Sequence, residues 1–326
     1  MTTAYNSSPI RLVIHGGAGA IKRNKLTAER EHAYRHALAQ SLIAGHAVLT
    51  AGGSSMDAVI AAITMMEDSP LFNAGKGAVF SHTGRNELEA SIMEGSTRMA
   101  GAVAGVTTIR NPIHAAHAVM TKSPHVMLVG QGAEAFAADQ GLEIVDPSYF
   151  YTQHRWNQLQ RAIARESILR DHDADPGAPL RDVDEKRGTV GAVALDRYGN
   201  LAAGTSTGGL TNKRYGRVGD SSIIGAGTYA DNRSVAVSAT GTGEMFIRTA
   251  AAFNTAAQVR LQCIPIAEAA ENTLAEIAAI GGDGGLIVLD MRGNYAMRFN
   301  TSGMYRGTIG NDGIAWTSVF PENLNY

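Results

Sequence analysis

A polar segment at residues 171–187 separates two parts of this chain that are apolar enough to form a core. The segment is dense in charged and turn-forming residues, and its apolar content is too low to bury it. Residues 189–196 are small and β-branched, which predicts a buried strand. Turn residues at 197–200 and a second apolar run at 201–207 complete a β-hairpin that begins at Thr189. The fold must therefore lead a polar loop directly into a buried strand.

The Gly188–Thr189 junction allows two interpretations: an ordinary loop entering a strand, or a cleavage site whose product begins with threonine. A hydroxyl is a weak nucleophile without a base, and a free α-amine, with a reference pKa of ~8, can serve as that base. Attack of the Thr189 hydroxyl on the Gly188 carbonyl would shift the acyl group from nitrogen to oxygen, leaving an ester for water to hydrolyse. Gly188 has no side chain and would admit the strained turn that this attack requires. Both interpretations are compatible with the local sequence.

Composition excludes several classes of protein. The chain has 326 residues, 44% hydrophobic and 18% charged, with a formal net charge of −2, so no electrostatic footprint suggests a nucleic-acid partner or an anionic membrane. Cys263 is the only cysteine, which excludes an intramolecular disulfide framework, and its apolar neighbours predict a buried side chain. The first residues resemble no signal peptide, and no window is long enough to span a membrane. We expect a cytoplasmic protein.

The pattern of the whole chain predicts layered α and β structure around antiparallel sheet, an α+β fold. Further strands are expected at 11–14, 100–108, 126–130, 286–290 and 295–299. Helices are expected at 27–50, from residue 54 onward, and at 114–121, 133–140, 153–169, 244–258 and 266–280. Glycines 16–19 after a strand would also fit a parallel dinucleotide-binding fold, but the G-x-G-x-x-G spacing is absent.

Two downstream motifs offer the other groups that acyl transfer needs. Residues 240–243, Thr-Gly-Thr-Gly, stand at the start of a predicted helix, where a hydroxyl and backbone N–H groups can face a developing oxyanion. Arg217 and Asp220 bring a cation and an anion together on a predicted loop, where they could clamp the carboxylate and the amine of an amino acid. A plain glycine-rich helix entry and a solvated ion pair are the alternatives.

Taken in order, these motifs resemble the plant-type asparaginases, also called isoaspartyl peptidases. The matching segments after the junction are 188–196, 205–209, 216–220 and 240–244, and those before it are 15–19, 70–75 and 100–106. The resemblance covers nearly the whole chain. It implies an N-terminal nucleophile hydrolase: a single domain over residues 1–326 with an αββα sandwich. The precursor would cut itself into an α subunit, 1–188, whose residues from about 170 to 188 form a flexible linker, and a β subunit, 189–326.

The resemblance also assigns roles to residues. It makes Thr189 the nucleophile, with Thr207 hydrogen-bonded to it, and it builds the oxyanion hole from Thr240 and the Gly241 N–H. The implied substrate-binding residues, with Arg217 on the α-carboxylate and Asp220 and the Gly243 carbonyl on the α-amine, are Asn73, Arg217, Val218, Gly219, Asp220, Thr242 and Gly243. No cofactor is implied for catalysis. A structural sodium ion is implied, held by main-chain carbonyls of Met66, Glu67, Ser69, Phe72, Ala74 and Lys76.

The resemblance predicts a threonine hydrolase that releases aspartate from β-aspartyl dipeptides and ammonia from asparagine. It further implies a dimer of cleaved αβ heterodimers. Arg214 and Tyr215 depart from the family pattern, where an apolar residue and a proline are expected, so the shape of the substrate loop stays open. A glycosylasparaginase and an uncleaved, inactive binding protein of the same fold are the alternatives.

Overall fold

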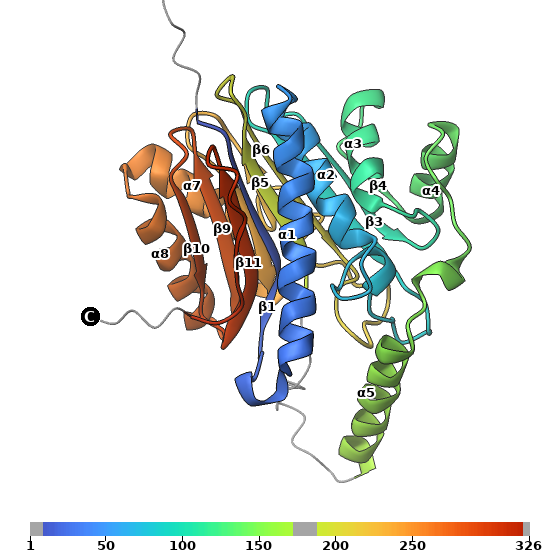
Figure 1. Cartoon of the computed structure of the whole chain (residues 1–326). Coiled ribbons are helices and arrows are strands. Elements are labelled where there is room, and N and C mark those ends of the chain that lie inside the picture. The colour runs from blue at the N-terminus through green and yellow to red at the C-terminus, as the bar shows by residue number, and fades with distance from the viewer. Residues whose placement is uncertain (1–8, 172–187, 322–326) are drawn as a thin grey trace, which may run out of the picture.

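The computed structural model describes residues 9–171 and 188–321, which form two β-sheets flanked by helices (Figure 1). The larger sheet has the strand order β12-β11-β1-β5-β6-β2-β3-β4, and the smaller has the order β10-β9-β8-β7. The strands are β1 (Arg11–Gly19), β2 (Leu88–Glu94), β3 (Ala100–Val106), β4 (Met127–Val129), β5 (Val190–Leu195), β6 (Leu201–Thr207), β7 (Thr228–Ala230), β8 (Val235–Gly241), β9 (Gly284–Asp290), β10 (Tyr295–Phe299), β11 (Gly303–Gly310) and β12 (Trp316–Ser318). The α-helices are α1 (Ala28–Thr50), α2 (Ser55–Glu67), α3 (Pro112–Lys122), α4 (Gly130–Asp139), α5 (Gln153–Asp171), α6 (Gly243–Arg248), α7 (Ala251–Gln262) and α8 (Ile266–Ala279). This mixture of helices and mainly antiparallel sheet confirms the α+β prediction.

Each sheet is covered on both faces. Helices α1, α2 and α3 pack on one face of the larger sheet, and the smaller sheet packs on its other face (Figure 1). Helices α7 and α8 cover the outer face of the smaller sheet. Successive residues of a strand point to opposite faces, so Leu12 and Ile14 join the apolar cluster under the helices, while Val13 joins the cluster of the smaller sheet. Because both faces are buried, these strands are almost continuously apolar.

The hairpin predicted at residues 189–207 is present and lies in the middle of the larger sheet. β5 pairs with β6 in antiparallel register, and β5 also pairs with β1. Val193 and Leu195 belong to the cluster of the smaller sheet, so Thr189, which has the same parity, begins on the face toward that sheet. Leu201 and Ala203 share that cluster, which places Thr207 on the same face of β6. The register therefore brings both hydroxyls into the space between the sheets.

Strands from both sides of the polar segment alternate in the larger sheet. β1 and β2, which precede the segment, are the outer neighbours of β5 and β6, which follow it. A cut before Thr189 would thus leave both products hydrogen-bonded in one sheet. Most of the predicted flexible linker lies outside the described residues, although residues 170 and 171 continue α5 as helix.

Two expectations about the region after residue 243 are wrong. The helix expected at 244–258 is broken into α6 and α7, because Ala250 adopts a left-handed conformation with φ of 47°. The N–H groups of Ala252 and Phe253 then donate to carbonyls of a distant loop, at Ala226 and Gly225. Cys263 is exposed rather than buried, because it ends α7 with φ of 57°.

No helix among the described residues is both long and apolar enough to cross a membrane, as the sequence predicted.

Candidate active site

The hydroxyls of Thr189 and Thr207 form a direct hydrogen bond at the Gly188–Thr189 peptide. Thr189 Oγ1 donates to Thr207 Oγ1 at 3.1 Å, and the Thr207 hydroxyl lies 3.3 Å from the Gly188 carbonyl oxygen, to which it can donate. The Gly209 N–H donates to Thr207 Oγ1 at 3.0 Å and fixes its position. Thr189 is 8% exposed. The nearly buried Thr189 hydroxyl, its hydroxyl partner and the carbonyl of the preceding peptide therefore lie within one chain of contacts.

His15 holds the backbone of Thr189 in place. Its Nδ1 lies 3.0 Å from the Thr189 carbonyl oxygen, and its Nε2 lies 2.9 Å from Ser238 Oγ on β8. Burial lowers the pKa of His15 to about 3, so the ring is neutral at ordinary pH. A carbonyl oxygen can only accept, so the ring proton belongs on Nδ1, and Nε2 accepts from Ser238. Sequence reasoning placed His15 only in a glycine-rich motif, because its partner Ser238 is 223 positions away.

Gly191 allows this contact between the two sheets. A β-carbon at Gly191 would collide with Ser238 Oγ and with the His15 ring. The chain of buried hydroxyls continues from Ser238 to Thr205 at 2.7 Å and from Thr205 to Thr228 at 2.6 Å. Buried polar groups that are fully hydrogen-bonded make a site rigid. The backbone of the nucleophile is therefore linked to β8, which also carries Thr240.

The expected oxyanion residues lie at the end of β8. Gly241 lines the same pocket as Thr189, whereas Thr240 is 1% exposed and lies behind that surface. Thr240 Oγ1 accepts a hydrogen bond from the Ala18 N–H at 3.2 Å, so its own hydrogen can still be donated. Thr242 is turned elsewhere, because its hydroxyl donates to Asp283 Oδ1 at 2.6 Å.

Arg217 and Asp220 line the pocket next to Thr189, as the motif predicted. Arg217 makes two hydrogen bonds to the Glu244 carboxylate, at 2.9 and 3.0 Å. Asp220 is 4% exposed, and its Oδ2 is buried without a hydrogen-bond partner. Burial raises the pKa of Asp220 to about 7, although the Arg217 charge opposes the shift. An unsatisfied buried carboxylate oxygen beside a guanidinium is complementary to an amino acid, which carries both charges.

Gly243 allows these two groups to approach each other. A β-carbon at Gly243 would lie 2.8 Å from Arg217 Nη2 and 2.9 Å from Asp220 Oδ1. The pocket that results contains most of the predicted site; it is lined by Gly188, Thr189, Thr207, Gly209, Leu210, Arg217, Gly219, Asp220, Ser221 and Gly241. Among the predicted substrate residues, Val218, Thr242, Gly243 and Asn73 are not in this lining.

A buried ion pair that the sequence did not reveal supports the Arg217 loop. Glu89 on β2 is fully buried and pairs with Lys213 at 3.3 Å. The other carboxylate oxygen of Glu89 accepts the Gly219 N–H at 2.8 Å, within the turn that carries Arg217 and Asp220. Glu89 stands among mainly apolar residues of β2, and this is the signal in the sequence that could have drawn attention to it.

Asn73 lies behind the junction and joins two loops. Its Nδ2 donates to the Gly209 carbonyl at 2.8 Å, and its Oδ1 accepts from the Val79 N–H at 2.9 Å. A β-carbon at Gly188 would lie 3.1 Å from Cβ of Asn73, so the two residues are in close contact. The structure thus places Asn73 near the nucleophile with its amide already bonded to the backbone.

The loop expected to hold sodium contains crowded carbonyl groups. The Glu67 carbonyl approaches Gly75, and the Phe72 and Pro70 carbonyls approach Gly77, so closely that a β-carbon at either glycine would collide with them. Oxygen atoms are the ligands that hard cations prefer, and a sodium ion at this loop stays a prediction. Within the described ranges, no group of three or more His, Cys, Asp or Glu side chains is arranged to hold a metal.

Comparison with known proteins identifies the family of this chain. A family model described as asparaginase matches residues 8–319. The putative isoaspartyl peptidase/L-asparaginase of Dictyostelium discoideum is 48% identical over 321 residues, covering 91% of this chain and 92% of that protein. The isoaspartyl peptidase of Salmonella typhimurium is 52% identical over 296 residues, with 90% and 93% covered, and the Homo sapiens isoaspartyl peptidase/L-asparaginase is 40% identical over 298 residues, with 91% and 92% covered. The match extends over both sheets and the whole candidate site, and the chain belongs to the asparaginase family of hydrolases.

Proposed function

We propose that this chain cuts itself before Thr189 and then hydrolyses β-aspartyl dipeptides and L-asparagine, releasing L-aspartate. The observation that carries the proposal is the chain of contacts from the Thr189 hydroxyl through Thr207 to the Gly188 carbonyl, beside a pocket with Arg217 and Asp220. The names of the three relatives support the same substrates. The layers described above would form the αββα sandwich of N-terminal nucleophile hydrolases, as a single domain.

In the first reaction, the Thr189 hydroxyl attacks the Gly188 carbonyl carbon. Thr207 lies where it can donate to the carbonyl oxygen as negative charge develops there. The C–N bond breaks, its nitrogen takes the proton, and an ester joins Gly188 to Thr189. Water hydrolyses this ester, which leaves a carboxylate on Gly188 and both the hydroxyl and a free α-amine on Thr189. The products are the α subunit, 1–188, and the β subunit, 189–326.

In the second reaction, Arg217 holds the substrate α-carboxylate, while Asp220 and the Gly243 carbonyl hold the α-amine. The free amine of Thr189 accepts the proton of its own hydroxyl, which attacks the side-chain carbonyl of the substrate. Thr240 and the Gly241 N–H donate to the oxyanion. The amine of the leaving group departs with a proton, and water then hydrolyses the ester to release aspartate. Both substrates share the groups that are held, so one site serves both.

Val218, Gly219, Thr242 and Asn73 have supporting roles in this proposal. The Gly219 N–H donates to the Glu89 carboxylate and so fixes the turn, and Val218 connects Gly219 to Arg217 in the chain. Thr242 anchors the Thr240–Gly241 segment to Asp283. Sodium, held by main-chain carbonyls of Met66, Glu67, Ser69, Phe72, Ala74 and Lys76, would fix the loop that carries Asn73. The cleaved heterodimers would associate in pairs and act in the cytoplasm.

The substrate assignment is tested by comparing turnover of β-aspartyl-leucine, asparagine and a glycosylated asparagine by the same cut preparation. We expect the dipeptide and asparagine to be hydrolysed with higher kcat/KM than the glycosylated substrate. Faster turnover of the glycosylated substrate would assign the chain as a glycosylasparaginase instead. A protein that binds aspartate but turns over none of the three would be an inactive binding protein.

A further inference from the structure

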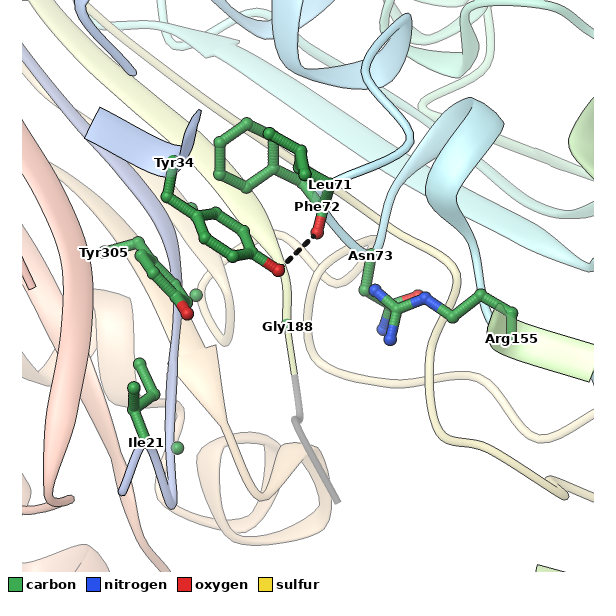
Figure 2. A pocket seen from close by; sticks show the side chains of 11 residues that line it. Ile21, Tyr34, Leu71, Phe72, Asn73, Arg155, Gly188 and Tyr305 are labelled. Carbon is green, nitrogen blue, oxygen red and sulfur yellow. Dashed lines mark hydrogen bonds between the residues drawn. The ribbon is translucent and has the colours of Figure 1, made fainter. Parts of the chain in front are cut away.

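A second pocket borders Gly188 (Figure 2), and its lining includes neither Arg217 nor Asp220. Of the residues that the structure describes, Gly188 alone lines both pockets. The second pocket is lined by Gly16, Gly17, Gly19, Ile21, Tyr34, Leu71, Phe72, Asn73, Arg155, Gly188 and Tyr305. None of its side chains was assigned to a step of the two reactions described above. The backbone at Gly188 therefore forms the partition between an amino-acid pocket and a mainly apolar one.

The apolar wall of this pocket is rigid and aromatic. The rings of Tyr34 and Tyr305 stack with their centroids 4.2 Å apart, and Phe72 packs edge-on against Tyr34 at 5.7 Å. The Tyr34 hydroxyl donates to the Leu71 carbonyl at 3.1 Å, as Figure 2 shows. Each of these three rings is at most 3% exposed. Hydrophobic and aromatic side chains of this kind line most small-molecule pockets.

The opposite wall is polar and contains Asn73 and the Arg155 guanidinium, both labelled in Figure 2. Arg155 is 3% exposed and donates through Nε to the Gly77 carbonyl at 2.8 Å. The leaving group of a dipeptide is itself an amino acid, with one side chain and one carboxylate. A pocket with an aromatic wall facing a guanidinium matches both groups.

The partition is held in place by close contacts on two sides. A β-carbon at Gly17 would lie 2.7 Å from Cα of Gly188, and a β-carbon at Gly188 would lie 3.1 Å from Cβ of Asn73. Cleavage before Thr189 breaks the bond that anchors Gly188 to β5. When the new chain end withdraws, the space between Gly17 and Asn73 connects the two pockets.

We propose that this second pocket, together with the space that Gly188 would vacate after the cut, is the leaving-group subsite of the cut enzyme and takes an apolar side chain. This proposal rests on the proposed function. Arg217 and Asp220 fix the acyl half of the substrate in the first pocket, and the scissile carbonyl must lie at Thr189 Oγ. The leaving group then extends past Thr189 into the space that Gly188 occupied. Ammonia released from asparagine is too small to contact this wall, whereas leucine is not.

The test compares two substrates in one preparation. We measure the ratio of kcat/KM for β-aspartyl-leucine to kcat/KM for asparagine in the cut wild type, Tyr305→Ala and Ile21→Ala. Removing one or more apolar groups from a substrate pocket changes discrimination by about tenfold or more, so the ratio should fall by about that factor in Tyr305→Ala. Tyr305→Phe, which retains the ring, should keep the wild-type ratio. A purely structural defect would lower both kcat/KM values together and leave the ratio unchanged.

Tyr198→Ala is the matched control, because Tyr198 is 68% exposed on the turn between β5 and β6 and lines neither pocket. If Tyr305→Ala does not fold or cut, Ile21→Ala decides, with a smaller fall expected. An unchanged ratio in the variants, with a wild type that cuts itself and hydrolyses both substrates, overturns the subsite but not the proposed function. A wild type that neither cuts nor hydrolyses asparagine overturns both.

Discussion

Asp220 should make amino-acid binding pH-dependent near neutrality. Its pKa is raised to about 7 because it is buried, and only the charged form can pair with the substrate ammonium. With that pKa, about one tenth of the protein has Asp220 charged at pH 6 and about nine tenths at pH 8. Competitive inhibition by L-aspartate should therefore strengthen about tenfold between these pH values, equivalent to about 1.4 kcal/mol.

Glu244 provides a perturbation that isolates this titration. Its negative charge contributes to the raised pKa of Asp220, and its carboxylate is paired with Arg217. Glu244→Gln removes a negative charge that offsets the positive charge of Arg217. Arg217 then favours the charged form of Asp220 more strongly, so the pKa of Asp220 should fall. The midpoint of the inhibition profile should then move to lower pH. The free amine of Thr189 titrates in a similar range, but the pH of its midpoint should change far less in this variant.

The assay is the inhibition constant of L-aspartate against β-aspartyl-leucine turnover, measured from about pH 5.5 to about pH 8.5. Glu268→Gln, an exposed change on α8, is the matched control and should reproduce the wild-type midpoint. A wild-type inhibition constant that is independent of pH between 6 and 8 would refute the assignment of Asp220 to the substrate amine. A midpoint that stays in place in Glu244→Gln would refute the electrostatic argument.

Three further changes test the surroundings of the site. His15 has a pKa of about 3 in the folded chain and 6.5 when exposed, so the free energy of unfolding should fall as the pH drops below 6.5, by about 2 kcal/mol at pH 5. In His15→Gln, chemical denaturation should show a loss between neutral pH and pH 5 that is smaller by about 2 kcal/mol. Glu89→Gln leaves buried Lys213 without its anionic partner and should cost about 3 kcal/mol in the same measurement, and a loss below 1 kcal/mol would contradict a supporting role. Gly17→Ala forces a side chain toward Gly188 from a backbone with φ of 105°, so cleavage followed on a denaturing gel should slow markedly; wild-type cleavage kinetics would show that the contact is unimportant.

Local patterns predicted most of the elements, but they did not predict which elements meet. The expected helices and hairpins appear because their periodicity reports burial on one or two faces. The break between α6 and α7 was not predictable, since it depends on a loop near Gly225 that caps α7 from a distance. Strands β2, β7, β8, β11 and β12 were not predicted, although β8 brings both Ser238 and Thr240 to the site.

The same limit applies to the candidate site. The local motifs pointed to Thr189, Arg217 and Asp220, and the family resemblance added Thr207; all four line one pocket. The motifs could not indicate the contact of His15 with Ser238, since partners 223 positions apart leave no local pattern. Thr242 was expected to contact substrate, whereas its hydroxyl is bound to Asp283.

The measurement that tests the central claim most directly is the intact mass of the purified protein, together with sequencing of any new N-terminus. The account predicts two polypeptides, residues 1–188 and 189–326, with Thr189 first in the second. Thr189→Ala should remain a single chain without hydrolase activity, whereas Thr189→Ser, which keeps a hydroxyl, should still be cut. A wild-type protein that hydrolyses asparagine as one uncut chain, or a Thr189→Ala variant that is cut at the same bond, would contradict the claim that this threonine makes its own active site.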